Sequence, residues 1–206
     1  DYIAENIRQI RAQMEEAALR AGRDPKEILL CAATKMNPAE AVRAAIAGGV
    51  DCCGENRVQE MTAHLDDDAY AGAALHFIGH LQTNKVRQVV GRVELIESVG
   101  SEHLLEAIEA QAAKLELVQD ILLEVNIGGA HGNPSVAAGP DGNRPFFAKM
   151  RQLYVDIRSQ MDDNKTSFDC LSMGMSGDFE DAVREGATLV RVGTALFGPR
   201  PPMHKG

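Results

Sequence analysis

Lys35 lies at the end of a predicted strand, where a lysine side chain can act as a nucleophile. It follows the apolar run 28–34, which has the length of a buried strand, and precedes Asn37-Pro38-Ala39-Glu40. This tetrapeptide predicts a helix start, with asparagine as N-cap, proline at the first helical position and glutamate completing a capping box. Partial removal from water makes a lysine amine a better nucleophile towards a carbonyl. The alternative is a solvated lysine beside a helix start.

Two glycine-containing turns are candidates for an anion site. Gly174-Met175-Ser176-Gly177-Asp178 follows a strand-like run and opens a helix, so backbone N–H groups around Ser176 and Gly177 favour an anion. Arg191-Val192-Gly193-Thr194 repeats this arrangement, with Gly193 and Thr194 at the next strand end. Neighbouring strand ends with small residues match the phosphate sites that barrels build after their last strands. The first turn alone is also explained as an ordinary tight turn with Ser176 as N-cap.

Arg191 and two further polar residues also lie at or near predicted strand ends. An unpaired guanidinium in an apolar strand is costly, so Arg191 needs a buried partner: a carboxylate, or a ring nitrogen or anion of a ligand. Asn56 and His80 follow two other strands; taken singly, they are better explained as a helix cap and a core histidine. Glu55 and Arg57, which flank Asn56, are expected to pair with each other.

Taken together, these residues describe a pocket for pyridoxal phosphate. Lys35, Asn56, His80, Ser176, Arg191 and Thr194 all fall at the same end of the predicted parallel sheet. The aldehyde would join Lys35 as a Schiff base, the phosphate would lie on the Ser176 and Thr194 loops, and Arg191 would face the pyridine nitrogen.

The rest of the chain predicts an α/β fold that positions these residues. Short apolar strands alternate with amphipathic helices, which is typical of a parallel sheet covered by helices. The predicted strands are 28–34, 50–53, 76–80, 93–99, 120–127, 168–173 and 188–192, and the helices are 3–21, 38–47, 57–65, 82–90, 101–115, 144–160 and 179–185.

Seven predicted strands leave a TIM-type (β/α)8 barrel one strand short. The shortfall lies between the fifth and sixth strands, where the loop 128–143 either hides a degenerate strand or replaces a missing piece of the natural chain. An open doubly wound sheet is the alternative, but no GxGxxG motif follows a strand, which argues against a dinucleotide site.

Composition narrows the class of protein. The chain has 206 residues, consistent with a single domain over 1–206, and its net charge of −9 opposes nucleic-acid binding. No apolar run has membrane-spanning length and no signal peptide opens the sequence.

The four cysteines, Cys31, Cys52, Cys53 and Cys170, lack CxxC spacing and are interpreted as reduced thiols, not as a metal site or disulfide frame. We therefore expect a cytoplasmic protein, with a mitochondrial pool as the alternative.

Several stretches resemble the pyridoxal phosphate homeostasis proteins, the YggS/PROSC group, and the match looks closest to animal members. The matching stretches are 33–35, 54–60, 76–85, 125–128, 171–179, 185–188 and 191–198. The resemblance implies a barrel like the N-terminal domain of alanine racemase, with the cofactor on Lys35. One departure is that the family has a further Gly-Leu-Met type strand where this chain has only 130–143.

The resemblance also bears on activity. The family is thought to store the cofactor and deliver it to apo-enzymes, without robust turnover, so the expected partners are pyridoxal phosphate and recipient apo-enzymes, and the protein is expected to be a monomer. Racemisation needs a base on each face of the cofactor, and the twelve residues after Thr194 are too few for the second domain that supplies one in racemases. The alternatives are a weak amino-acid racemase or lyase, and a phosphosugar-type barrel without this cofactor.

Overall fold

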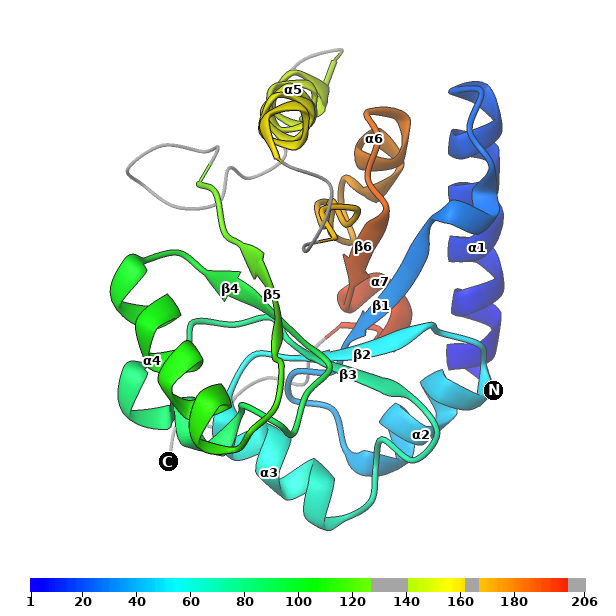
Figure 1. Ribbon diagram of the computed structural model, residues 1–206. Helices are drawn as coiled ribbons and strands as arrows, with labels where there is room; N and C mark the ends of the chain where they lie inside the picture. Colours follow the sequence, from blue (N-terminus) through cyan, green and yellow to red (C-terminus); the bar gives the residue numbers. More distant parts are fainter. Residues whose placement is uncertain (127–140, 162–166, 200–206) are drawn as a thin grey trace.

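A six-stranded parallel sheet organises the chain in this computed structural model, which describes residues 1–126, 141–161 and 167–199. The strand order is β5-β4-β3-β2-β1-β6, and the sheet curls so that its inner face is concave (Figure 1). The strands are β1 (Leu29–Ala33), β2 (Cys52–Glu55), β3 (Ala74–Phe77), β4 (Leu95–Val99), β5 (Asp120–Leu123) and β6 (Leu189–Val192). The predicted α/β alternation and parallel pairing are confirmed.

Helices follow most of the strands and cover the outer face of the sheet (Figure 1). They are α1 (Tyr2–Arg20), α2 (Ala39–Ala47), α3 (Val58–Asp66), α4 (Glu102–Lys114), α5 (Arg144–Gln160), α6 (Phe179–Arg184) and α7 (Thr194–Phe197), with 3₁₀ helices η1 (Pro25–Glu27) and η2 (Thr83–Gln88). Among the described residues, no helix combines the length and hydropathy that crossing a lipid bilayer requires.

The apolar residues of helix α1 pack against the sheet as their spacing in the sequence predicts. Ile3, Ile7, Ile10 and Met14 recur at helical spacing and are buried against the outer side chains of β1 and β6. Each such side chain contributes about 1.5–3 kcal/mol by leaving water. The Asp1 side chain caps the helix by accepting a hydrogen bond from the Ile3 N–H at 3.1 Å. A second apolar cluster, around Met61, Phe77 and Ile96, joins α3, α4 and η2 to β2, β3 and β4.

The predicted strand 168–173 is wrong. Only Ser172 forms a bridge there, with Leu189 of β6. The reason is local: the side-chain hydroxyl of Thr188 accepts the hydrogen bond of the Leu171 N–H at 2.8 Å, where a ladder would use a backbone carbonyl. Strand β5 ends at Leu123, earlier than predicted, and most of the loop 128–143 lies outside the described residues.

Two helix predictions need correction. Asn37 does not cap α2: the N-cap residue is Pro38, without a side-chain cap, and the Asn37 amide donates to the Lys35 carbonyl instead, at 3.0 Å. The predicted helix 82–90 is the shorter 3₁₀ helix η2. Ser101, in contrast, caps α4 as its position in the sequence predicts, accepting from the Leu104 N–H at 3.2 Å.

Candidate functional site

The turn that carries Lys35 lies between β1 and α2 and is tied down on both sides. The Asn37 N–H donates to the Thr34 carbonyl at 3.1 Å, and the Met36 N–H donates to the Glu60 carboxylate at 3.1 Å. Met36 adopts a positive φ of 61°, which turns the chain sharply after Lys35. Lys35 itself is half-buried. The lysine is therefore presented from a fixed backbone.

A buried carboxylate, Glu55, anchors this turn from β2. Its Oε1 accepts hydrogen bonds from the Thr34 hydroxyl at 2.5 Å and the Tyr70 hydroxyl at 2.6 Å, and lies 2.6 Å from His64 Nδ1. The other His64 nitrogen lies 2.9 Å from the Asn37 carbonyl. Burial and the charge of Glu55 raise the pKa of Tyr70 well above its usual value. Glu55 thus holds both flanks of the Lys35 turn.

The pairing of Glu55 with Arg57 predicted from the sequence is wrong. The guanidinium of Arg57 lies 3.9 Å from Glu60 instead, and it is exposed. The reason is that the Glu55 side chain is directed into the core, where the groups from three other segments already satisfy one of its oxygens.

Ser176 joins the two predicted anion-binding loops. Its hydroxyl oxygen accepts hydrogen bonds from the backbone N–H of Gly193 at 3.2 Å and of Ala195 at 3.1 Å. The tight turn predicted as the alternative is present, closed by the Asp178 N–H and the Met175 carbonyl at 3.1 Å, but Ser176 does not cap α6, whose N-cap residue is Asp178. Gly177 and Thr194 are exposed beside it. Two N–H groups therefore converge on one oxygen atom, which is the geometry that a phosphate oxygen needs.

Arg191 has a carboxylate partner, Glu97 of β4. The two side chains approach to 3.7 Å between Nη1 and Oε2. The same carboxylate accepts from the Ser172 hydroxyl at 2.7 Å, and its other oxygen lies 2.8 Å from His76 Nδ1. Arg191 Nε is buried and has no hydrogen-bond partner among the described residues. The guanidinium is thus charge-paired with Glu97, and its buried Nε donor can serve a further acceptor.

Asn56 and His80 lie on neighbouring turns after β2 and β3. A side chain added at Gly79 would place its Cβ 2.1 Å from the Asn56 carbonyl oxygen, so the two turns are in backbone contact. Asn56 is half-buried and does not cap α3, whose N-cap residue is Arg57. His80 is exposed, so its reading as a core histidine is wrong.

The sheet register brings the turns that carry Lys35, Asn56 and Gly193 to one edge, whereas Arg191 lies inside β6, opposite Cys31 of β1. Strand β1 pairs with β2 on one side and β6 on the other, aligning Ala33 with Gly54 and Ala32 with Val192. The turn that carries Lys35 therefore lies between the turn that carries Asn56 and the Gly193 loop. These turns lie at the carboxyl ends of the strands, where α/β barrels place their sites.

A second cluster lies on the inner face of the sheet, and the sequence reasoning missed it. Cys31, Cys52 and His76 are buried, and their ligand atoms all lie within 4.8 Å of one another. The hydrogen bond from Cys31, followed by that from His76, outweighs burial and lowers the pKa of Cys52 to about 6. Burial, the largest influence on His76, lowers its pKa, but Cys52 and Glu97 together raise it to about 10.

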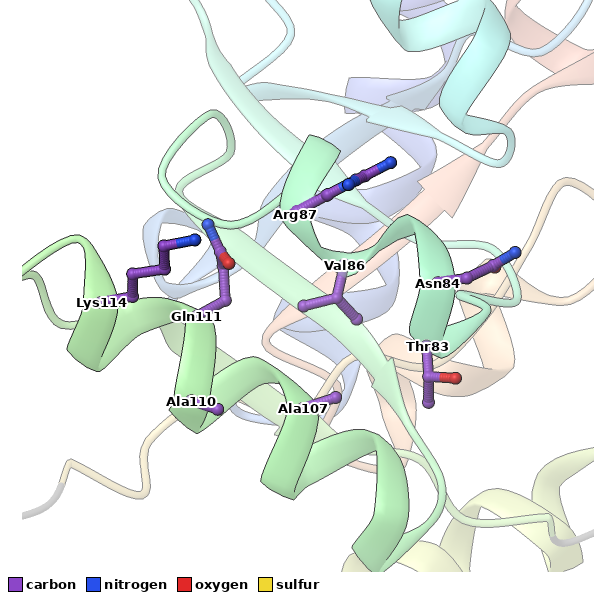
Figure 2. Close-up of a pocket in the computed structure, with 8 residues that line it drawn as sticks. All are labelled: Thr83, Asn84, Val86, Arg87, Ala107, Ala110, Gln111 and Lys114. Carbon is purple, nitrogen blue, oxygen red and sulfur yellow. The ribbon is translucent and has the colours of Figure 1, made fainter.

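A separate groove of about 490 Å³ lies between η2 and α4 (Figure 2). Arg87 of η2 and Lys114 of α4 give it a basic lining. None of the residues predicted to bind the cofactor lines this groove, so it is not the site at the strand ends.

Sequence comparison supports a family assignment. No family model matches the chain. The pyridoxal phosphate homeostasis protein of Aquifex aeolicus is 35% identical, covering 95% of this chain and 97% of the relative. The Escherichia coli K12 protein of the same name is 32% identical, covering 96% and 97%. The Aquifex alignment runs over 225 positions, more than the 206 residues here, so that relative has residues this chain lacks.

Comparison with solved structures supports the same family assignment. PipY of Synechococcus elongatus PCC7942, solved with PLP bound, superposes with a TM-score of 0.82 at 30% identity, covering 95% of this chain and 100% of PipY. Alanine racemase of Streptomyces coelicolor superposes with a TM-score of 0.69 at 15% identity, over 97% of this chain and 58% of the racemase, which confirms the barrel-type fold. The chain belongs to the pyridoxal phosphate homeostasis protein family.

Proposed function

We propose that this protein binds pyridoxal 5'-phosphate, holds it as a Schiff base on Lys35, and takes part in vitamin B6 homeostasis by delivering the cofactor to apo-enzymes. The observation that carries the proposal is the convergence of the Lys35 turn and the Ser176–Gly193 loop pair at one edge of the sheet, with Arg191 two residues before Gly193 in β6. The names of the relatives and the PLP-bound neighbour support the same cofactor.

Lys35 supplies the covalent contact in this proposal. Its amine would condense with the cofactor aldehyde, forming a carbon–nitrogen double bond and releasing one water. Hydrogen bonds from Thr34 to Glu55 and from Met36 to Glu60 hold the turn before the cofactor arrives. A fixed backbone lowers the entropy that binding must overcome.

The Ser176 and Gly193 loops supply the phosphate contacts. The N–H groups of Gly193 and Ala195 already converge on the Ser176 hydroxyl oxygen. A phosphate oxygen can accept these donors together with the hydroxyl, and exposed Gly177 and Thr194 leave the approach open. Asn56 and His80, at the ends of β2 and β3, would line the opposite side of the ring.

Arg191 supplies the contact to the pyridine nitrogen. Its Nε is a buried donor without a partner among the described residues, so it fits a ring nitrogen that accepts a hydrogen bond. When bound, the cofactor contributes an electrophilic aldehyde and an electron sink. A permanently protonated arginine donates its own hydrogen and leaves the ring nitrogen unprotonated, which weakens that sink. The arrangement therefore favours carriage of the cofactor over efficient amino-acid chemistry.

Two assays on the PLP-loaded protein test this function. The first mixes it with an apo PLP enzyme and follows recovery of that enzyme's activity, with the Lys35→Ala protein as control. We expect recovery only with the unsubstituted protein. The second follows racemisation or cleavage of amino acids, and we expect turnover below about 1 per second, the low end of ordinary enzymes. Faster turnover would instead establish a racemase or lyase, and absence of a Schiff-base absorption band would favour a phosphosugar-type barrel.

A further inference from the structure

Three consecutive strands place two thiols and an imidazole on the inner face of the curled sheet. Cys31 and Cys52 are register partners in β1 and β2, so their side chains lie on the same face. His76 lies opposite Gly54, two residues beyond Cys52, which puts it on this face as well. Their ligand atoms all lie within 4.8 Å of one another, and all three side chains are buried.

The ligand set has a definite chemical preference. Thiolate sulfur and imidazole nitrogen are soft and borderline ligands, and tetrahedral sites built from them select Zn²⁺ among the common divalent cations. Tetrahedral Zn²⁺ holds its sulfur and nitrogen ligands about 3.5–3.8 Å apart. Each pair of ligand atoms would therefore have to approach by about 1.3 Å at most to reach this geometry.

Glu97 completes the pattern of a metal-binding histidine. Its Oε1 lies 2.8 Å from His76 Nδ1, so the second ring nitrogen is the one available to a metal. The carboxylate is itself oriented by Ser172, whose hydroxyl donates to Oε2 at 2.7 Å. Metal-binding histidines nearly always have such a carboxylate or carbonyl partner on the other nitrogen.

We propose that Cys31, Cys52 and His76 form a binding site for one Zn²⁺ ion inside the curled sheet, beside Arg191, which Glu97 links to His76. Two thiolates neutralise the charge of the ion, and their deprotonation makes binding release protons. Cys170 packs beside Cys31 and Cys52.

Cobalt titration tests the site directly. The full chain, reduced with a phosphine and freed of metal by chelation, is titrated with Co²⁺ in the presence and absence of pyridoxal phosphate. We expect a thiolate-to-cobalt charge-transfer band and visible bands of tetrahedral Co²⁺ that saturate at one equivalent. Added Zn²⁺ should remove them. Absence of these bands at excess Co²⁺ would overturn the proposal whether or not the protein binds the cofactor.

The adjacent cysteines provide a matched pair of variants. Cys53 follows Cys52 in β2 but packs on the outer face, in the cluster around Met61. Cys52→Ala should abolish the charge-transfer band, whereas Cys53→Ala should keep it, with circular dichroism confirming that both fold. Glu97→Gln should weaken Co²⁺ binding about 10–100-fold. Equal bands in the Cys52→Ala protein and in the unsubstituted protein would refute the site.

Discussion

The hydroxyl oxygen of Ser176 lies 3.2 Å from the backbone nitrogen of Gly193 and accepts its hydrogen bond. This contact joins the loop that precedes α6 to the loop that follows β6. A second N–H, from Ala195, reaches the same oxygen at 3.1 Å. The two loops identified separately in the sequence therefore form one structure, with converging donors of the kind that bind phosphate.

Removing that hydroxyl should weaken cofactor binding. Hydrogen bonds to charged groups contribute about 1.5–3 kcal/mol, so Ser176→Ala should raise the dissociation constant for pyridoxal phosphate about tenfold or more. Absorbance titration of the apo-protein measures the constant. Ser159→Ala, on the exposed face of α5, is the matched control and should bind normally. Equal affinity in the two variants would show that the Ser176 loop does not hold the phosphate.

The close contact between Gly79 and Asn56 predicts that a side chain at residue 79 destabilises the fold. A Cβ at residue 79 would lie 2.1 Å from the Asn56 carbonyl oxygen, and backbone cannot move aside as a side chain can. Gly79→Ala should lower the free energy of unfolding by about 1–3 kcal/mol. At Gly100 the nearest contact is the end of the flexible Glu124 side chain, at 3.2 Å, so Gly100→Ala should cost less. Urea denaturation compares the two, and an equal loss would count against the rigid contact.

Replacing Arg191 should change the electronic state of the cofactor more than its retention. Arg191→Gln removes the permanent charge proposed to face the ring nitrogen but leaves the Ser176 loop in place. We expect a shifted absorption band of the bound cofactor and a pH dependence that the unsubstituted protein lacks. Arg184→Gln, whose guanidinium pairs with Asp181 on α6, is the control. An identical spectrum in the Arg191 variant would place the ring elsewhere.

Because the Cys53 thiol is buried, we expect the folded protein to lose stability at alkaline pH. Burial, followed by the charges of Cys52 and Glu55, raises the pKa of the Cys53 thiol from 9.0 to about 12. Its stabilising contribution is complete below pH 9 and is lost as the pH rises towards 12, because the unfolded thiol ionises first. The slope is about 1.4 kcal/mol per pH unit for one group. Chemical denaturation across this range should show a shallower slope for Cys53→Ala; an unchanged slope would contradict the assignment.

The positions of the site residues could be predicted from sequence because they depend on local order. Lys35, Asn56, His80 and Gly193 each follow a strand, and parallel strands bring their carboxyl ends to one edge. The loops proposed to bind phosphate were identified from their glycine and serine residues. Features that depend on the order of strands and loops along the chain could therefore be predicted from the sequence pattern.

The partners of those residues could not be predicted, because they come from other strands. Glu97 lies 94 positions before Arg191, and no local pattern joins them. Glu55 likewise accepts hydrogen bonds from Thr34 and Tyr70, which lie 21 and 15 positions away in the chain. The cluster of Cys31, Cys52 and His76 has no CxxC spacing, since each residue comes from a different strand, and only the register brings the three together.

Reduction with borohydride tests the central claim most directly. Treating the PLP-loaded protein with borohydride fixes the cofactor to the amine that holds it, and peptide mass spectrometry then locates the modified residue. The account predicts one pyridoxyl group, on the peptide containing Lys35, with none incorporated in the Lys35→Ala protein and normal incorporation in Lys114→Ala. A pyridoxyl group on another lysine, with equal incorporation after Lys35→Ala, would contradict it.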